Sequence, residues 1–231
     1  MSWCLCGYLS VVEDVAAIIL AAGQSSRMGA FKPLLPFGDK TVIEYTIDYL
    51  RLGGSETIIV VVSNRADEIR AHLQNAGVVF ATNPEPHSAM ATSIICGLAA
   101  LPHEAQAVII TPVDHPAVPH EVVSQLINAW REGAGLVIPT NANRGGHPVL
   151  IDLSFRVELV GLDPKLGLKS FFAAHRNAVK RVAVHSNYIA RDMNTWDDYR
   201  WLHREVFGVL PTKEHLPELQ AMKSRTREET N

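Results

Sequence analysis

The residues best suited to chemistry lie between Leu20 and Lys32, where a short apolar run ends in small and polar residues. In chain order the candidates are Leu20, Ala21, Ala22, Gly23, Ser25, Ser26, Arg27 and Lys32. Small residues let backbone N–H groups approach a phosphate, and hydroxyls and cations bind its oxygens. The loop therefore predicts a triphosphate-binding site, with an ordinary turn carrying two solvated cations as the alternative. Its spacing is neither GxGxxG nor GxxxxGK[ST], which disfavours a dinucleotide oxidoreductase or a P-loop NTPase.

A carboxylate follows another apolar run. Asp114 comes shortly after Ala107–Ile110, within Thr111-Pro-Val-Asp-His-Pro116, where prolines restrict the backbone. Magnesium prefers one or two carboxylates together with phosphate oxygens and water. Asp114 is therefore a candidate Mg²⁺ ligand, a turn aspartate being the alternative, and the role of His115 stays open.

Two glycines precede a histidine in Arg144-Gly-Gly-His-Pro148. Glycines adopt unusual dihedral angles and let a ligand approach the backbone closely. His147 is thus a candidate for binding an anionic group, and a packed turn residue is the alternative.

Short continuous apolar runs predict the strands that position these residues. Such runs suit strands buried on both faces, and they comprise Val15–Leu20, Thr57–Val62, Gly77–Phe80, Ala107–Ile110 and Gly135–Ile138. Between them apolar residues recur with helical spacing, over Ile43–Leu50, Ile94–Leu101 and, after Pro119, Val122–Trp130. This alternation predicts βαβ units and an α/β fold with a mostly parallel sheet and right-handed crossovers. Two short apolar runs around Gly145-Gly146 predict a small antiparallel excursion near residues 136–151.

The last third of the chain is less regular. Its pattern predicts a helix around Lys169–His175, a strand at Arg181–His185 and a final helix over Trp196–Val206. Residues 211–231 are rich in Lys, Glu and Arg, which is typical of a solvated tail. We therefore expect an N-terminal extension (1–14), one domain (15–207) and a C-terminal tail (208–231).

Composition narrows the classes of protein. The chain has 231 residues, 47 % of them apolar, and a net charge of −3, which favours a folded α/β domain and disfavours a nucleic-acid partner. No apolar run approaches the roughly 18 residues that span a membrane, and the first ten residues lack the basic start of a secretory signal. Three cysteines, Cys4, Cys6 and Cys96, form no even framework and indicate the reducing cytoplasm. Cys4-x-Cys6 has no second pair at zinc-like spacing, so we interpret it as part of a loosely packed extension.

One resemblance extends this interpretation. Ala21-Ala-Gly-Gln-Ser-Ser-Arg-Met-Gly29 with Lys32-Pro-Leu-Leu35 resembles the signature of the molybdenum cofactor cytidylyltransferase family, and the likeness runs from about Val15 to Val206. It implies a Rossmann-like, three-layer α/β/α fold with a sheet of the nucleotide-diphospho-sugar transferase type. It also implies that Arg27 and Lys32 hold a triphosphate, that the Ala22–Gly23 backbone lies near the nucleotide, and that Asp114 binds the metal.

The same resemblance covers a segment from Asn83 to Ser93, which corresponds to the family's loop around the base and ribose. It implies that Ser93 contacts the nucleotide. Ala89 stands where the family usually has glycine, so the backbone path there is open. In the alternative interpretation, the hydroxyl of Ser88 or Thr92 caps the helix that follows this loop.

Two more segments acquire roles from the resemblance. Gly146, His147 and Pro148 match the family's loop toward the second substrate. Arg191-Asp-Met-Asn-Thr-Trp-Asp-Asp198 resembles an acidic family segment, in which Asp192 and Asn194 occupy the metal-binding positions. Asparagine retains a carbonyl oxygen but removes one negative charge, and which of the two meets the metal stays open. Thr195, Asp197 and Asp198 are also suited to the start of a helix.

The expected reaction transfers CMP from CTP to the phosphate of a molybdopterin-type acceptor, with Mg²⁺ as cofactor and pyrophosphate as the second product. Arg27, Lys32 and Asp114 are its expected catalytic residues, and a molybdoenzyme or its chaperone is a further expected partner. The alternatives are a molybdenum cofactor guanylyltransferase, a methylerythritol-phosphate cytidylyltransferase, and a non-catalytic carrier of nucleotide or pterin. Ala22 and the serine pair before Arg27 favour the cytidine branch, and Lys32-Pro-Leu-Leu lacks the Pro-Lys-Gln-Tyr pattern of the methylerythritol-phosphate enzymes.

Overall fold

The computed structural model describes residues 14–23, 28–85 and 88–211. The expectations for Ser25, Ser26, Arg27, Cys4 and Cys6 lie outside these residues, and the division into extension, domain and tail stays a prediction. Among the described residues, no helix has the length and apolar character that a membrane crossing needs.

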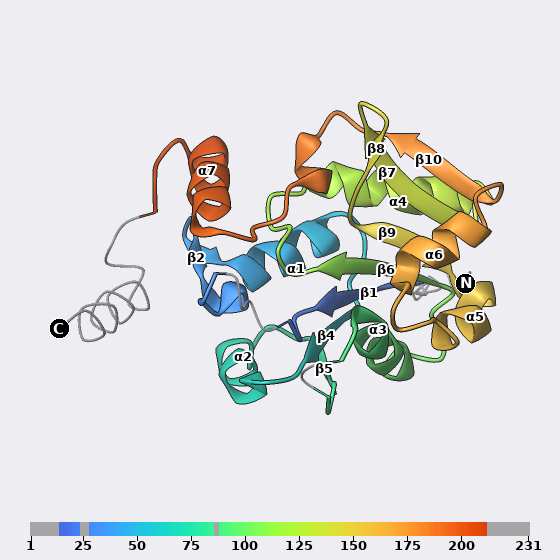
Figure 1. The fold of residues 1–231 in the computed structure, drawn as a ribbon, viewed down its shortest axis with the longest axis horizontal. Coiled ribbons are helices and arrows are strands. Elements are labelled where there is room, and N and C mark those ends of the chain that lie inside the picture. Colours follow the sequence, from blue (N-terminus) through green and yellow to red (C-terminus); the bar gives the residue numbers. More distant parts are fainter. Residues whose placement is uncertain (1–13, 24–27, 86–87, 212–231) are drawn as a thin grey trace, which may run out of the picture.

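An eight-stranded sheet forms the middle layer of the molecule (Figure 1). Seven strands follow the order β10-β7-β9-β6-β1-β4-β5, and β8 pairs with β7. Their bounds are β1 (Val15–Leu20), β4 (Ile58–Val62), β5 (Val79–Thr82), β6 (Ala107–Pro112), β7 (Leu136–Asn141), β8 (Arg144–Gly145), β9 (Val149–Asp152) and β10 (Val179–Ala183). A separate small ribbon joins β2 (Pro36–Phe37) to β3 (Lys40–Thr41).

The sheet is parallel except at β8, which is antiparallel to β7, and at β9. β1 pairs in parallel with β4 and β6, and β10 pairs in parallel with β7. β9 is antiparallel to both β6 and β7, which it separates. The predicted antiparallel excursion is therefore confirmed, and so is the Rossmann-like three-layer fold.

Helices cover both faces of the sheet (Figure 1). The α-helices are α1 (Val42–Leu52), α2 (Ala66–His72), α3 (Met90–Ala99), α4 (His120–Arg131), α5 (Arg156–Val160), α6 (Gly167–Ala174) and α7 (Trp196–Phe207). Short 3-10 turns are η1 (Lys32–Leu34), η2 (Leu153–Phe155) and η3 (Asn187–Ala190). Capping boxes fix two of these starts, Thr41 with Glu44 at α1 and Thr195 with Asp198 at α7.

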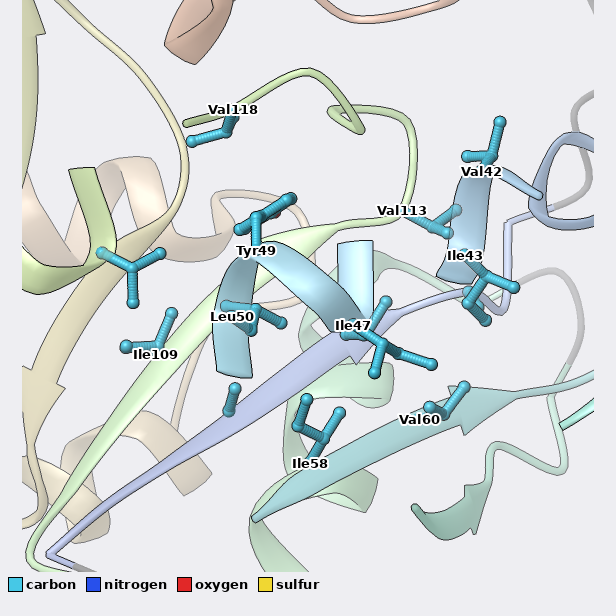
Figure 2. Close-up of a cluster of buried hydrophobic side chains, with 14 of the residues drawn as sticks. Val42, Ile43, Ile47, Tyr49, Leu50, Ile58, Val60, Ile109, Val113 and Val118 are labelled. Atoms are coloured by element: carbon cyan, nitrogen blue, oxygen red, sulfur yellow. The ribbon is translucent and has the colours of Figure 1, made fainter. Parts of the chain in front are cut away.

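Two apolar clusters hold the layers together. In the first, Ile43, Ile47 and Leu50 of α1 pack with Ile58 and Val60 on one face of the sheet (Figure 2), together with side chains from α4 and α7. In the second, α3, α5 and α6 cover the opposite face. Successive residues of β1 alternate between the two clusters, because neighbouring side chains of a strand point to opposite faces. This explains why the central strands are continuously apolar.

The structure changes the predicted bounds of one helix and one strand, and the predicted start of another helix. The expected helix at Lys169–His175 is α6, two residues earlier at its start, and the expected strand at Arg181–His185 is β10, also two residues earlier. The expectation of a Ser88 or Thr92 cap is wrong, because Ala89 precedes α3 without a side-chain cap. Ser88 instead accepts a hydrogen bond from Asn83.

Candidate functional site

The site forms where β1 and β6 end. These strands are neighbours in parallel register, with Leu20 opposite Pro112, so the residues that follow each strand meet at one edge of the sheet. The N–H of Val113 donates to the carbonyl of Leu20 at 3.2 Å. Gly23 is exposed, and a Cβ placed there would meet nothing within 4 Å. The predicted phosphate loop therefore begins at the same edge of the sheet as the segment that carries Asp114, and no described residue crowds Gly23.

The segment before α7 joins the same edge. The N–H of Met193 donates to the backbone carbonyl of Asp114 at 3.0 Å. Met193 is fully buried in the core, which fixes Asp192 and Asn194 on either side of it. The Thr195–Asp198 capping box then holds the turn from Asn194 into α7, and the N–H of Asn194 donates to Asp198 at 3.2 Å.

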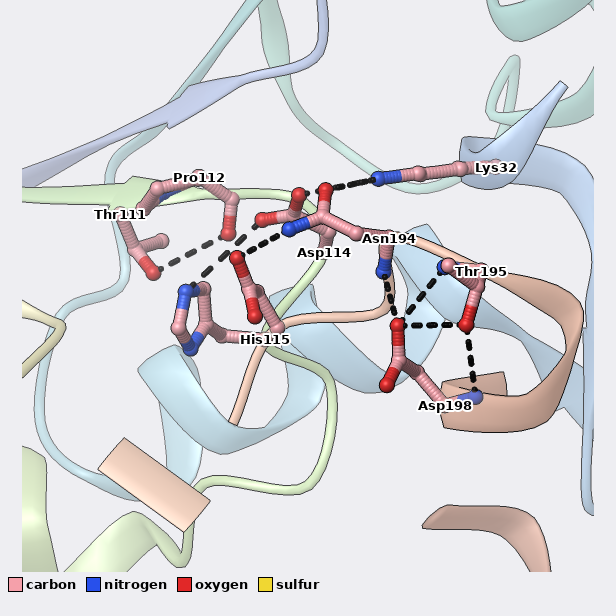
Figure 3. Close-up of polar contacts among 9 residues, drawn as sticks. Lys32, Thr111, Pro112, Asp114, His115, Asn194, Thr195 and Asp198 are labelled. Carbon is pink, nitrogen blue, oxygen red and sulfur yellow. Dashed lines mark hydrogen bonds and ion pairs between the residues drawn. The ribbon is translucent and has the colours of Figure 1, made fainter. Parts of the chain in front are cut away.

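The side chain of Lys32 reaches into this cluster from one side, with its ammonium group toward Asp114 and Asn194 (Figure 3). Its ammonium Nζ donates to Oδ2 of Asp114 at 3.2 Å and to Oδ1 of Asn194 at 3.1 Å. Only 9 % of the Lys32 side chain is exposed, against 21 % for Asp114. Asp114 and Asn194, which are 82 and 162 positions from Lys32 in the sequence, thus converge on it, and burial strengthens the interaction between the charges of Lys32 and Asp114.

The donor set fits a hard divalent cation. Oxygens of Asp114 and Asn194 already meet around one positive charge, the ammonium of Lys32, and the Asn194 amide donates to Asp192. Carboxylate and amide oxygens are the ligands that Mg²⁺ and similar ions prefer. Within the described ranges, no three His, Cys, Asp or Glu side chains gather as a metal site. The arrangement therefore suits a cation that also receives oxygens from a bound phosphate.

The segment after β5 is ordered around Asn83. Its amide donates to Ser88 and to Ser93, both at 2.9 Å, and its carbonyl oxygen accepts the N–H of Glu85 at 2.9 Å. Asn83 and Ser93 are both buried. The hydroxyl of Ser93 thus holds this loop against α3, and its contact with a nucleotide stays a prediction.

A cavity of about 890 Å³ lies beside the Asp114 cluster, a size that suits a ligand larger than a single phosphate. Asp114, Asp192 and Asn194 line it, together with Gly146 and His147 of the predicted acceptor loop. Pro148, the third residue of that loop, is buried and is not among the lining residues. The remaining lining residues are Met90, Pro112, His115, Ile138, Gly145, Val149, Leu168, Lys169, Phe172, Ala173, Arg176, Val179, Arg181, Ile189 and Ala190.

Close backbone packing positions the predicted acceptor loop, Gly146 to Pro148. A Cβ on Gly146 would overlap the carbonyl group of Ile189, and the N–H of His147 donates to that same carbonyl oxygen at 2.8 Å. Glycine is therefore required for the loop to lie against η3, and this contact directs His147 into the cavity wall.

Two imidazoles face each other in this wall. The ring centroids of His115 and His147 are 5.3 Å apart, and the Nδ1 atoms of both rings are buried without a hydrogen-bond partner. Burial lowers the pKa of His147 to about 4, helped by the neighbouring His115. Burial also lowers the pKa of His115, although Asp114 and Asp192 act in the opposite direction. Both rings are therefore neutral near pH 7, so His147 offers a hydrogen bond rather than a positive charge.

The structure brings together four of the residues singled out in the sequence. Lys32, Asp114, Asp192 and Asn194 form one cluster. Sequence reasoning left the role of His115 open and did not place it beside His147, because no spacing signals a contact between residues 32 positions apart. Sequence reasoning also missed the cationic residues of the cavity. The helical spacing of Lys169, Ala173 and Arg176 could have indicated that these residues lie on one side of a helix.

The fold and the site define this chain as a Rossmann-like α/β/α protein. Its candidate site lies at the carboxyl ends of parallel strands, where such folds bind nucleotides. Comparison with known families then identifies the family: the MobA-like NTP transferase domain matches residues 17–179. The chain belongs to this family and is a nucleotidyltransferase of the MobA-like type.

Curated relatives include several activities. A nicotine blue oxidoreductase of Paenarthrobacter nicotinovorans is 30 % identical over 152 residues, 62 % of this chain and 72 % of that protein. A molybdenum cofactor cytidylyltransferase of Escherichia coli is 27 % identical over 141 residues, 61 % of this chain and 71 % of that enzyme. A probable molybdenum cofactor guanylyltransferase of Rhodopirellula baltica is 32 % identical over 127 residues, 52 % of this chain but only 58 % of its own length.

Solved structures extend the likeness over the fold. Rv0371c of Mycobacterium tuberculosis is 27 % identical with a TM-score of 0.75, covering 84 % of this chain and 99 % of that one. A second structure of Rv0371c is a complex with manganese, at 26 % identity and a TM-score of 0.70, covering 83 % of this chain and 98 % of that one.

Proposed function

We propose that this nucleotidyltransferase transfers CMP from CTP to the phosphate of a molybdopterin-type acceptor and releases pyrophosphate. The observation that carries the proposal is the ammonium of Lys32 between Asp114 and Asn194, beside a cavity that has room for an acceptor. A buried cation next to metal-type oxygens is suited to binding the charged oxygens of a triphosphate.

In the proposed reaction, an acceptor phosphate oxygen attacks the α-phosphorus of CTP. The new P–O bond forms as the bond between the α-phosphorus and the bridging oxygen of pyrophosphate breaks, and pyrophosphate leaves with that electron pair. Lys32 and Arg27 neutralise charge on the phosphates, so catalysis rests on positioning and electrostatics. The acceptor phosphate is already ionised at neutral pH, and the mechanism needs no strong general base.

Asp114, with Asn194 or Asp192, would hold a divalent cation, expected to be Mg²⁺. When bound, this cation would supply positive charge to the triphosphate. The oxygens that meet at Lys32 support this assignment. The relative Rv0371c has been solved in complex with manganese, which supports a divalent cation in this family.

The choice of CTP rests on Ala22 and the serine pair before Arg27. GTP is the runner-up nucleotide, supported by the guanylyltransferase relative. Methylerythritol phosphate is the runner-up acceptor, and a non-catalytic carrier of nucleotide or pterin is the remaining alternative.

The test measures pyrophosphate release with CTP, GTP, ATP and UTP in parallel, with Mg²⁺ and either molybdopterin or methylerythritol phosphate. Asp114→Asn keeps the shape of the side chain but removes its charge. We expect CTP-dependent turnover with molybdopterin, reduced about 100-fold or more in this variant. Asp197→Asn is the matched control, because the Asp197 side chain is 94 % exposed and pairs with Arg200 on α7.

Several outcomes would contradict the proposal. A preference for GTP would overturn the base assignment, and turnover with methylerythritol phosphate alone would overturn the acceptor. Nucleotide binding without pyrophosphate release would favour the carrier. Oxidoreductase activity on nicotine blue, without nucleotidyl transfer, would instead place the chain with its oxidoreductase relative.

A further inference from the structure

The segment that carries Lys32 is held in a different way from the segment that carries Asp114. Asp114 follows β6, which has a paired strand on each side in the main sheet. Lys32 begins the turn η1, and the strands that follow it, β2 and β3, pair only with each other among the described residues. Figure 1 shows β2 beside α7, apart from the main sheet. Strand pairing therefore positions Asp114, whereas the position of Lys32 depends on the helices that pack against its segment.

A hydrogen bond from α7 reaches this segment four residues after Lys32. The hydroxyl of Tyr199 donates to the carbonyl oxygen of Pro36 at 2.5 Å, and Tyr199 is fully buried. Burial raises the pKa of Tyr199 to about 12, so the hydroxyl keeps its proton at neutral pH. Asn194, which accepts from Lys32 at 3.1 Å, is joined to the start of α7 by its N–H bond to Asp198. The Lys32–Asn194 and Pro36–Tyr199 hydrogen bonds therefore connect the same two segments.

Aromatic packing fixes α7 against the residues that follow Pro36. Tyr199 and His203 lie one turn apart on the same side of the helix, with ring centroids 6.1 Å apart. Phe37 is fully buried and packs edge-on against His203, with ring centroids 5.8 Å apart. Nε2 of His203 also accepts the N–H of Gly38 at 3.4 Å. The helix thus holds the segment at successive positions, and the Tyr199 hydroxyl is the polar contact nearest to Lys32 on this side chain face.

The contacts of the ammonium leave little room for displacement. Its distances to Asp114 and Asn194, 3.2 and 3.1 Å, lie at the upper end of the hydrogen-bonding range. A carbonyl that loses its donor is stabilised by moving toward water or another donor, so loss of the Tyr199 hydroxyl would shift the backbone at Pro36. Misplacement of a catalytic group by about 1 Å lowers rates by as much as about 100-fold.

We infer that Tyr199 is a positioning residue for the ammonium of Lys32. Its hydroxyl holds the Pro36 backbone on α7, the same helix whose start places Asn194 against that ammonium. The consequence for nucleotide binding rests on the proposed function, in which Lys32 binds the triphosphate, whereas the consequence for the position of Lys32 does not.

The test removes the hydroxyl with Tyr199→Phe, which keeps the buried ring. Tyr45→Phe is the matched control, because the Tyr45 ring also packs edge-on against Phe37, with centroids 5.3 Å apart, but its hydroxyl donates to Asp39 at the surface. Two properties of the full chain are measured without turnover. They are the rate of lysine acetylation by acetic anhydride, read by mass spectrometry, and the Kd for CTP in the presence of Mg²⁺.

Acetylation reports directly on the position of Lys32. The Lys32 side chain is 9 % exposed and that of Lys40 is 44 % exposed, so Lys40 serves as the internal reference. We expect the rate for Lys32 relative to Lys40 to rise about fivefold in Tyr199→Phe, because the segment opens more often, and to stay within twofold of wild type in Tyr45→Phe. A rate for Lys32 that is unchanged in Tyr199→Phe would overturn the inference.

A double-mutant cycle separates positioning of Lys32 from general support of the fold. The Kd for CTP should rise about tenfold in Tyr199→Phe, but less than twofold when the same change is made in Lys32→Gln, where no ammonium is left to position. A tenfold loss in both backgrounds would show that Tyr199 supports the fold in general, contrary to the inference. If the wild type bound CTP but released no pyrophosphate with any acceptor, the proposed function would fail, and the acetylation rates and the cycle would still decide the role of Tyr199.

Discussion

A single buried ammonium organises the candidate site at the level of residues. Lys32 is 7 % exposed and touches both a carboxylate and an amide oxygen that are suited to a divalent cation. Its positive charge therefore neutralises Asp114 before any phosphate binds. A cation that enters without nucleotide must compete with Lys32 for the same oxygens, whereas a bound triphosphate offers the ammonium a new partner.

This competition predicts two opposite effects of Lys32→Gln. Mn²⁺ should bind several-fold more tightly in the absence of nucleotide, because its competitor is gone. Nucleotidyl transfer should fall about 100-fold in kcat/KM, because the triphosphate loses a preorganised cation. Titration of Mn²⁺ by electron paramagnetic resonance and pyrophosphate release measure the two effects.

Lys40→Gln is the control for the loss of one lysine charge. Lys40 pairs with Asp48 at 2.6 Å on the surface, away from the cluster. If Lys32→Gln weakened Mn²⁺ binding as well as turnover, Lys32 would position the metal ligands rather than compete with the metal.

The sequence predicted these residues to different degrees. Asp114 and the Leu20–Lys32 loop follow apolar runs directly, so their place at the edge of a parallel sheet follows from strand geometry. The convergence of Lys32 on Asn194 depends on the packing of Met193 and on the start of α7, which no local pattern reveals. The contact between His115 and His147 depends in the same way on the course of the β8–β9 loop.

At the level of elements, the predicted acceptor loop is fixed by one close contact. Gly146 allows the loop between β8 and β9 to lie against η3, where Ile189 accepts the N–H of His147. Since the loop and η3 both line the cavity, displacing one of them changes the shape of the proposed acceptor site more than that of the proposed nucleotide site.

Gly146→Ala should therefore destabilise the fold by about 1–3 kcal/mol, because the added methyl group overlaps backbone atoms that cannot move freely. We expect the KM for the acceptor to rise at least fivefold, with the Kd for CTP unchanged. Urea unfolding and steady-state kinetics provide the measurements.

Gly161→Ala is the matched control. A Cβ there would meet its nearest neighbour, the carbonyl oxygen of Val157, at an ordinary 3.5 Å. A Gly146→Ala variant with wild-type stability and acceptor KM would show that the loop does not depend on this contact.

Element prediction succeeded where burial is uniform and failed where it is not. β1 and β4 are buried at every position, so continuous apolar runs revealed them. α2 was not predicted, because Ile69 is its one buried residue and seven residues offer too short a pattern. β10 lies at the edge of the sheet with half-buried and exposed residues, which explains its shifted boundaries.

At the level of the whole molecule, the two apolar clusters place the polar groups of the site at the margin of a continuous core. His147 is held there as a neutral ring with a pKa of about 4, whereas an unfolded histidine has a pKa near 6.5. Unfolding below pH 6.5 therefore takes up a proton at this residue. The contribution of the neutral ring to stability is complete above about pH 6.5 and is lost as the pH falls toward 4.

The free energy of unfolding should consequently decline between pH 6.5 and 4, with His147 accounting for up to about 3 kcal/mol of the loss. His115 acts in the same direction, because burial lowers its pKa too. Glu44 and Asp152, whose pKa values are also lowered in the fold, add to the loss of stability at the acidic end of this range, so a variant of the histidine is needed to measure its share.

His147→Gln removes the titrating ring and keeps a neutral polar side chain. Urea unfolding of the wild type and of this variant, at half-unit steps from pH 7.5 to 4.5, separates the contribution of His147. A variant curve parallel to that of the wild type would mean that His147 is protonated as easily in the folded chain as in the unfolded one, and would contradict its neutral role in the cavity wall.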